Sequence, residues 1–303
     1  MQKFSLIVNS LILVTSFNVI KCENQILNKT RTTVPFNTSI CGIMSESHSL
    51  VQGGKISAAT HFPWLAAVFM NNNGEIIHTG SGSLISHNHI IIRARSVSIL
   101  DSSNFLVPVN VSTLQIHLGS IQYFQSQDNE SVKVGVEKIV NHPFAKKVSN
   151  TLYVNAISMI FTNREIEFTE KIKPVCLWPF MMEHENLAGK SAYIASHGFG
   201  SKRKSENLIR KHTHVTIQES CNDYFEDELK FSNETNLFCV KGDSNGSACI
   251  GDNQLFMKMN ENWFLKGFIS SVYKYDDGKC NSEALTLCED IQQNIILIKV
   301  LML

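Results

Sequence analysis

The sequence lacks an excess of charge of either sign. Its 303 residues contain 27 Lys and Arg and 27 Asp and Glu, so the formal net charge is zero. Without a global electrostatic field, there is no reason to expect nucleic acid or a membrane surface as a partner. The sequence also has no internal repeats and no low-complexity blocks. With 43% hydrophobic residues, the chain is predicted to form one large globular domain or two small ones.

The sequence also lacks an apolar run with the length and flanks of a membrane-spanning helix. Its N-terminal apolar run, residues 4–20, is broken by small polar residues. We interpret residues 1–22 as a secretory signal peptide cleaved near Cys22, with a membrane anchor as the alternative. Residues 23–40 are polar and are predicted to form a short exposed leader. The protein is therefore expected to be secreted and extracellular, without a membrane anchor.

No cysteine lies in a Cys-x-x-Cys motif or in a Cys/His cluster with zinc spacing. The eight cysteines are therefore expected to form disulfides in an oxidising compartment. If Cys22 leaves with the signal peptide, seven remain, and one thiol is free or pairs between molecules. The His-x-His pairs His87/His89 and His212/His214 each lack an apparent third ligand. We therefore expect no metal and no cofactor.

Asn-x-Ser/Thr sequons are frequent, which suits a chain that passes through the secretory pathway as a glycoprotein. We expect some of them to carry glycan. The sequons begin at Asn28, Asn37, Asn110, Asn129, Asn233 and Asn245.

From Cys41 onward, short β-rich runs alternate with turns rich in Asn, Gly and Ser. This pattern predicts an all-β sandwich or barrel. Two segments favour helix: residues 219–229, and the last dozen residues, where Ile291, Ile295 and Ile298 repeat at helical spacing. The closing segment, residues 295–303, is too short to span a bilayer and is predicted to form a packed terminal helix.

Six motifs fall in a recognisable order with consistent gaps. They read "GGKISAATHFPWLAAVF", "GSLIS", "VNHPF", "FTEKIKPVCLW", "FCVKGDSNGSACIGD" and "WFLKGFISS". Over about residues 41 to 300 the chain resembles the trypsin/chymotrypsin family of serine proteases, and especially its arthropod clotting, immune and patterning branch. For a domain over 41–303, the resemblance implies two six-stranded antiparallel β-barrels, an active site between them and a C-terminal helix.

The family's nucleophile motif, Cys-x-Gly-Asp-Ser-Gly-Gly, fixes which residue stands at the catalytic serine position. The sequence Cys249-Ile250-Gly251-Asp252 fits its spacing, which puts Asn253 in place of the serine. The Gly-Asp-Ser at 242–244 lacks the preceding cysteine and is not in register. Both glycines that follow the serine are also missing.

The other two triad positions are substituted as well. Aligned with the family's Thr-Ala-Ala-His-Cys, residues 92–96 put Arg95 in place of the general-base histidine. Aligned with Asn-Asp-Ile-Ala-Leu, residues 155–159 put Ala156 in place of the aspartate. An amide, a guanidinium and a methyl group supply neither a nucleophile, nor a base, nor an orienting carboxylate. The usual activation site is also altered, because Leu50 stands where the family is cut after a basic residue.

The resemblance also implies a set of disulfides. The pairs are Cys41–Cys176, Cys221–Cys239 and Cys249–Cys280. The bridge that flanks the catalytic histidine in the family is absent, with Gly80 and Ser96 at its two positions. Cys288 replaces an aromatic residue of the last strand, so we expect a buried free thiol, with an intermolecular bridge or competition for Cys249 as alternatives.

Two functional hypotheses follow from these residues. The first is a secreted pseudoprotease, an inactive homolog that binds a protease, a zymogen or a protease inhibitor in an extracellular pathway such as innate immunity. The second is a secreted endopeptidase or esterase with displaced chemistry, using Ser244 or Ser247 and one of the eleven histidines. A relic without a selected role is a third alternative.

Overall fold

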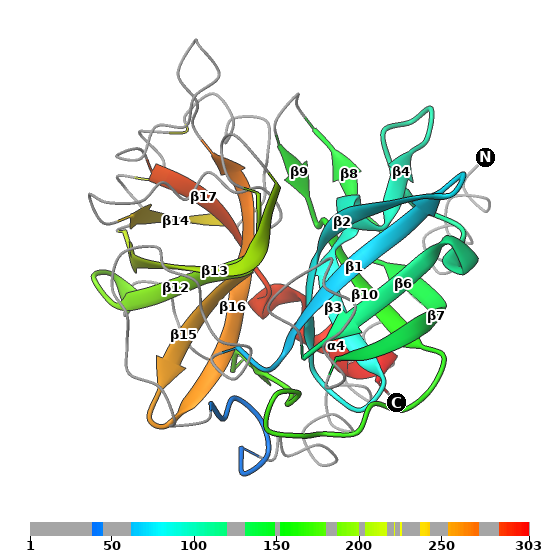
Figure 1. Ribbon diagram of the computed structural model, residues 1–303. Coiled ribbons are helices and arrows are strands. Elements are labelled where there is room, and N and C mark those ends of the chain that lie inside the picture. Colours follow the sequence, from blue (N-terminus) through cyan, green and yellow to red (C-terminus); the bar gives the residue numbers. More distant parts are fainter. Residues whose placement is uncertain are drawn as a thin grey trace, which may run out of the picture.

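Two β-barrels lie side by side, one formed by the first half of the chain and one by the second (Figure 1). The computed structural model describes residues 38–44, 62–119, 131–148, 152–179, 187–199, 204–216, 221, 225, 237–242, 254–272 and 285–302. The signal peptide and nearly all of the leader predicted above lie outside these residues.

The first barrel is closed, and all its strand pairs are antiparallel. Its strands follow one another in the order β1-β2-β3-β10-β7-β6 and back to β1. Their bounds are β1 Leu65–Asn72, β2 Glu75–Leu84, β3 His89–Arg93, β6 Leu114–Leu118, β7 Val132–Asn141 and β10 Ile157–Thr162. Buried Val, Leu and Ile side chains fill the barrel, since β-branched residues pack well on a pleated surface.

The second barrel contains β16-β15-β12-β13-β14-β17 in sheet order and closes through antiparallel pairing of β16 with β17. The bounds are β12 Ser191–Phe199, β13 Lys204–Val215, β14 Leu237–Gly242, β15 Gln254–Met259, β16 Asn262–Val272 and β17 Leu285–Asp290. A short parallel strand, β11 (Cys176–Leu177), adds to β16. The prediction of two six-stranded antiparallel barrels is confirmed.

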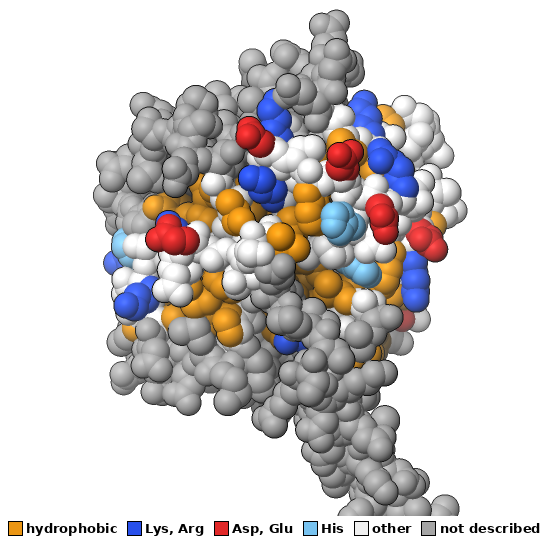
Figure 2. Space-filling model, turned by 90° about the horizontal axis from the view of Figure 1, so that it is seen from below, with side chains coloured by type: hydrophobic (Ala, Val, Ile, Leu, Met, Phe, Trp, Pro, Cys, Tyr) orange, Lys and Arg blue, Asp and Glu red, His pale blue; other side chains and the backbone are white. Residues whose placement is uncertain are grey.

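Several short strands and turns flank the first barrel. Beside the first barrel, β4 (Ser98–Leu100) pairs with β5 (Leu106–Pro108), and β8 (Lys146–Lys147) pairs with β9 (Tyr153–Val154). A 3-10 turn, η2 (Ala94–Ser96), follows β3, and η3 (Val111–Thr113) precedes β6. Viewed from below, the described surface mixes Lys and Arg with Asp and Glu around apolar side chains (Figure 2). This mixture agrees with the zero net charge.

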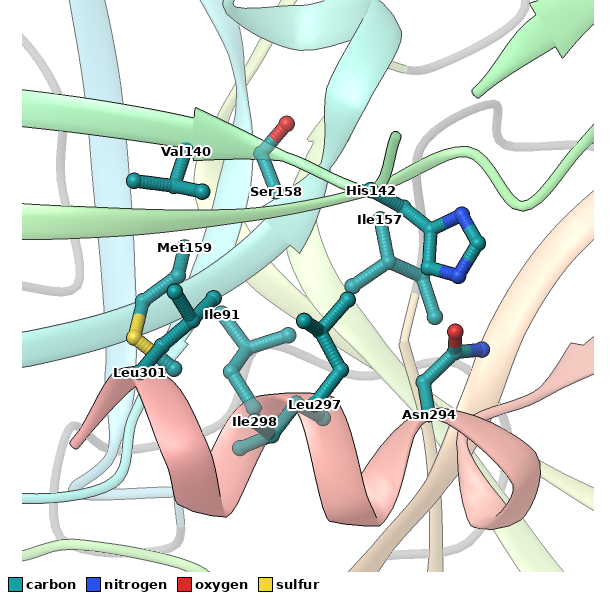
Figure 3. A pocket seen from close by; sticks show the side chains of 10 residues that line it. All are labelled: Ile91, Val140, His142, Ile157, Ser158, Met159, Asn294, Leu297, Ile298 and Leu301. Atoms are coloured by element: carbon teal, nitrogen blue, oxygen red, sulfur yellow. The ribbon is translucent and has the colours of Figure 1, made fainter. Parts of the chain in front are cut away.

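The chain ends in the predicted helix. The turn η5 (Gln292–Asn294) leads into α4 (Ile295–Leu301), whose Ile295 and Ile298 are buried. Figure 3 shows how α4 lies against strands of the first barrel and bounds a small pocket. The pocket is lined by Ile91, Val140, His142, Ile157, Ser158, Met159, Asn294, Leu297, Ile298 and Leu301. Among the described residues, no helix is long and apolar enough to cross a membrane.

Aromatic side chains join the two barrels. Phe62 and Trp64, which lead into the first barrel, contact Phe256 of the second at ring-centroid distances of 5.6 and 5.5 Å. Trp263 approaches Phe62 at 6.0 Å. All four rings are buried, and one hydrophobic cluster continues from one barrel into the other. Aromatic pairs add about 0.5–1.5 kcal/mol each beyond the apolar area that they bury.

Two of the expected disulfides lie among the described residues, and both are formed. Cys41 is joined to Cys176, and Cys221 to Cys239. The first bridge holds a short N-terminal segment against the second barrel. There Gly42 has a φ of +65°, and an added Cβ would lie 2.3 Å from the Trp263 carbonyl oxygen, so only glycine fits. The expected Cys249–Cys280 pair lies outside the described residues.

The thiol of Cys288 is buried and free, as the resemblance led us to expect. Burial raises the pKa of the thiol well above its ordinary range, and the charge of Asp290 raises it further. The Arg93 guanidinium acts in the opposite direction but does not outweigh burial. Cys288 therefore behaves as a protonated, apolar core side chain.

A fully buried ion pair lies at the closing seam of the second barrel. The Lys266 ammonium of β16 lies 2.7 Å from the Asp290 carboxylate of β17, and neither side chain is more than 1% exposed. Burial lowers the pKa of Lys266, while the Asp290 charge and hydrogen bond oppose that shift. The ammonium also lies 4.7 Å from the centre of the Trp178 ring and 3.2 Å from Gln292 Oε1. The charge of Lys266 thus depends on Asp290.

This dependence predicts the effect of breaking the pair. Asp290→Asn should lower the free energy of unfolding by about 3–5 kcal/mol, because the lysine charge loses its buried counter-ion. In the double variant Lys266→Met/Asp290→Asn most of that loss should be recovered, because no buried charge remains. Urea unfolding measures both values. Equal losses in the single and the double variant would contradict this account.

Candidate functional site

Two of the three positions that correspond to the family's catalytic triad lie among the described residues. They are close together, one just after the end of β3 and the other just before the start of β10. Arg95 sits in η2 directly after β3, and Ala156 directly precedes β10. These strands pair antiparallel, with Arg93 opposite Ile157. The Ala94 amide donates to the Ala156 carbonyl oxygen at 2.6 Å. Asn253 directly precedes β15 in the sequence but lies outside the described residues.

Arg95 is half-buried, and its guanidinium carbon lies 6.0 Å from the centre of the Tyr153 ring, within range of a cation–π contact. A guanidinium stays protonated at any physiological pH and therefore cannot accept a proton from a nucleophile. Ala156 is fully buried, and its methyl group cannot orient a base. These two side chains supply neither proton transfer nor positioning of a base.

A carboxylate does reach this place, but it comes from the other barrel. Glu289 of β17 is fully buried, and its two oxygens accept from the Ala156 amide at 3.1 and 3.3 Å. The close approach of β16 to β17 helps position Glu289. An added Cβ on Gly267 would lie 2.3 Å from the Glu289 carbonyl oxygen, so the two strands could not approach as closely with a larger residue there.

A second buried side chain reaches in the opposite direction, from the first barrel to the second. Arg93, at the end of β3, is 1% exposed. One of its terminal nitrogens donates to the carbonyl oxygen of Ile269 and, at 3.3 Å, to that of Ser270, both in β16 of the second barrel. Buried charges are tolerated only where hydrogen bonds compensate them. Each barrel therefore binds the main chain of the other with one buried ionisable side chain.

A third polar contact crosses the barrels between Ser83 of β2 and Gln254 of β15. The Ser83 hydroxyl donates to the side-chain oxygen of Gln254, and both residues are fully buried. Gln254 stands where the family motif has the first glycine after the serine. We call Ser83, Arg93, Gln254 and Glu289 the cross-barrel residues.

The structure also describes Ser96 and Gly80, the two positions at which the family has the disulfide that flanks its catalytic histidine. Ser96 is 6% exposed, and its hydroxyl has no hydrogen-bond partner among the residues that the structure describes. Gly80 lies on β2. A buried hydroxyl without a partner costs about 1–3 kcal/mol. Nothing in the structure explains why serine rather than alanine stands here.

The remaining site predictions fall mostly outside the described residues. Ser244, Ser247 and five of the six sequons lie there. Asn110, the sixth, is exposed and caps η3, with its side-chain oxygen accepting from the Ser112 amide at 3.1 Å. No group of three metal-binding side chains occurs in the described part of the chain.

The histidines of the described His-x-His pair have structural contacts. His87 stacks on Phe168 with ring centroids 3.8 Å apart, and its Nδ1 lies 2.9 Å from the Ile166 carbonyl oxygen. The Nδ1 of His89 lies 2.7 Å from the Ser86 hydroxyl. Burial lowers the pKa of His89. Neither contact requires a metal.

Sequence reasoning missed all four cross-barrel residues. The signal for Arg93 was a charge at the end of the run Ile90-Ile91-Ile92, whose uniform apolarity indicates a strand buried on both faces. The signal for Glu289 was similar, because acidic residues end the apolar run "LTLC". Charges within buried strands require partners. The sequence offered no way to identify those partners in a different barrel.

The cross-barrel contacts predict a stability difference between buried and exposed acids. Glu289→Ala should lower the free energy of unfolding by about 1–3 kcal/mol, because the buried Ala156 amide loses its acceptor. The matched control is Glu261→Ala, which removes a 93% exposed acid that pairs only with Lys258 in the described structure. It should change stability by less than about 0.5 kcal/mol. Equal effects of the two variants, measured by urea unfolding, would contradict the proposed role of Glu289.

Comparisons with known proteins agree with this architecture. The family model described as Trypsin matches residues 51–253. The proclotting enzyme of Tachypleus tridentatus is 23% identical over 239 residues, which cover 76% of this chain and 61% of that protein. The CLIP domain-containing serine protease B4 of Anopheles gambiae is 24% identical over 262 residues, covering 82% and 69%.

Melanization protease 1 of Drosophila melanogaster is 23% identical over 243 residues, covering 73% of this chain and 58% of that protein. The chain thus spans about three fifths of the length of the first and third of these relatives. The family match covers about two thirds of the chain, and the two barrels agree with it. The chain belongs to the trypsin family of serine proteases.

Proposed function

We propose that this chain is a secreted, non-catalytic member of the family, a pseudoprotease that acts by binding in an extracellular proteolytic pathway. The observation that carries the proposal is the occupation of the triad positions by Arg95, Ala156 and Asn253. The first two lie on an intact barrel with well-paired strands. The argument against proton transfer from a serine therefore rests on the side chains of Arg95 and Ala156 and not on a distortion of the fold.

The cross-barrel residues support the same proposal. The family's reaction takes place between the barrels, where a substrate must enter. In this chain the amide of Ala156 is bound by Glu289, and the former glycine position holds the larger Gln254 in contact with Ser83. Buried, hydrogen-bonded side chains join the barrels at these points. Such contacts favour a rigid binding scaffold over a cleft that admits a peptide.

The pathway is inferred from the relatives. Their names include a proclotting enzyme, a melanization protease and a phenoloxidase-activating factor. A chain that keeps the architecture without the triad would bind a protease, a zymogen or a protease inhibitor of such a pathway. Because one fold can host many unrelated functions, a scaffold without the triad can serve in binding.

A serine-directed fluorophosphonate probe tests the absence of catalysis. The folded, secreted chain should show no labelling above that of its heat-unfolded form, because the position of the family's general base holds Arg95, whose guanidinium cannot accept a proton from a serine. An active trypsin-family protease in the same assay is the positive control. Stoichiometric labelling that disappears in Ser244→Ala or Ser247→Ala would overturn the proposal and establish the alternative of displaced chemistry.

A further inference from the structure

The C-terminal helix α4 follows the second barrel in the sequence but packs on the first barrel. It comes after β17, the last strand of the second barrel, and the turn η5. Across the pocket described above, it meets residues of β3, β7 and β10, which are all strands of the first barrel (Figure 3). Ile295 and Ile298 of the helix are buried. The helix therefore links the end of the second barrel to the first.

This helix is too short to be stable by itself. It has seven residues, and the side chain of Asn294 at its N-terminus makes no capping hydrogen bond. Isolated helices shorter than about 12–15 residues are marginal in water. The order of α4 therefore depends on its contacts with the first barrel. A change in charge at this contact can decide whether the helix stays docked.

His142, which directly follows β7, is the one ionisable side chain among the described residues that line the pocket under α4. The other nine lining residues are uncharged. Glu289 and Asp290 precede η5 in the sequence but do not line the pocket. Their carboxylates accept from the Ala156 amide and from the Lys266 ammonium. A positive charge on His142 would therefore meet no carboxylate in the pocket.

The elements packed around His142 carry further charged or titratable residues, and none of these lines the pocket either. β10 and η5 contribute none, and α4 contributes one. Those on β3, β7 and α4 are His89, Arg93, Lys133, Glu137, Lys138 and Lys299. The protonation state of His142 is thus governed by burial and hydrogen bonding at the pocket.

A hydrogen bond selects the neutral form of the His142 ring. The Phe144 amide donates to His142 Nδ1 at 3.2 Å, so the neutral ring carries its proton on Nε2. An imidazolium has an N–H group on both nitrogens, and its Nδ1–H would face the Phe144 N–H. Main-chain hydrogen bonds of 2.9 Å, from His142 to Ile157 and from Ala145 to His142, hold the turn in place. Protonation therefore requires the ring, and not the main chain, to move.

The helix side of the ring offers a protonated histidine little compensation. Figure 3 shows the Asn294 side chain next to the His142 ring. Asn294 is 3% exposed, and its amide nitrogen has no hydrogen-bond partner in the described part of the chain. This contact already contains one buried donor without an acceptor, and an imidazolium would add another. Burial also lowers the pKa of His142. Docking of α4 and protonation of His142 therefore oppose each other.

We propose that His142 is a pH-sensitive switch, which keeps α4 docked on the first barrel while its ring is neutral and releases the helix when the ring is protonated. In the undocked state the ring meets water and takes up a proton in its ordinary range, near about pH 6.5. The docked ring binds the proton less well. Docking is therefore complete above about pH 7.5 and weakens as the pH falls through about 6.5. This inference goes beyond the proposed function and holds whether or not the chain catalyses a reaction.

Hydrogen exchange followed by mass spectrometry tests the switch in the full secreted chain. The protection factor of the α4 amides, taken relative to an unstructured peptide of the same sequence at each pH, should fall about five- to tenfold between about pH 7.5 and about pH 5.0. The amides of β3, β7 and β10 should keep their protection, because only the helix is released. Unchanged protection of α4, or an equal loss in these strands, would overturn the proposal.

Two matched histidine variants assign the effect to one ring. His142→Gln cannot take up a proton, and its side-chain oxygen can still accept from the Phe144 amide, so α4 should stay protected over the same pH range. The control is His117→Gln on β6, outside the pocket. Burial, and then the charge of Lys133, lower the pKa of His117 to about 4. This control should keep the pH dependence of the parent chain. The same loss of protection in His142→Gln as in the parent, or no loss in His117→Gln, would assign the effect to another group and overturn the proposal.

A measurement on the parent chain makes the test independent of how the variants fold. Nitrogen-15 NMR of the histidine rings should show the proton of neutral His142 on Nε2. As the pH falls, the His142 signals should titrate together with the loss of α4 protection. A proton on Nδ1, or complete titration of His142 while α4 stays protected, would contradict the switch.

Discussion

The structure depends on how two closed barrels are held together through buried polar groups. Apolar packing alone would let the barrels shift, because hydrophobic contact is not directional. Arg93 reaches from the first barrel to main-chain oxygens of β16, and Glu289 reaches from the second barrel to the Ala156 amide. A buried charge is costly unless its hydrogen bonds are kept, so these contacts restrict the relative position of the barrels. Aromatic packing around Trp64 and Phe256 adds buried apolar contact between the barrels.

The same contacts link the substituted triad to the surface beside it. Ala156 carries no functional side chain, yet its amide binds Glu289, its carbonyl accepts from Ala94, and its methyl group packs under Leu106. The position that corresponds to the family's aspartate is thus a structural junction between the second barrel and the hairpin formed by β4 and β5. Retention of the framework alongside replacement of the reactive groups is what we expect of a protein whose selected property is binding.

Much of the fold followed from the sequence because the motifs are local. Glycine, proline and tryptophan at fixed spacings mark the turns and strand ends, and the terminal helix repeats Ile295 and Ile298 on one face. The two described bridges followed from the resemblance to the family, which implied both pairings. The cross-barrel residues did not follow, because Arg93 and Glu289 are about two hundred positions apart and only closure of both barrels makes them neighbours of the same site. The exposure of Ile99 and Val107 did not follow either, because an aliphatic side chain in a β-rich run resembles a core residue until the fold is known.

The most direct test of the central claim, that this scaffold binds without catalysing, is turnover of a combinatorial library of peptide and ester substrates by the intact secreted chain. We predict no hydrolysis above that of the buffer, and the same result for the Arg95→Ala variant. Turnover by the parent chain that is lost on mutation of Ser244 or Ser247 would contradict the account, because it would require a catalytic centre away from Arg95 and Ala156.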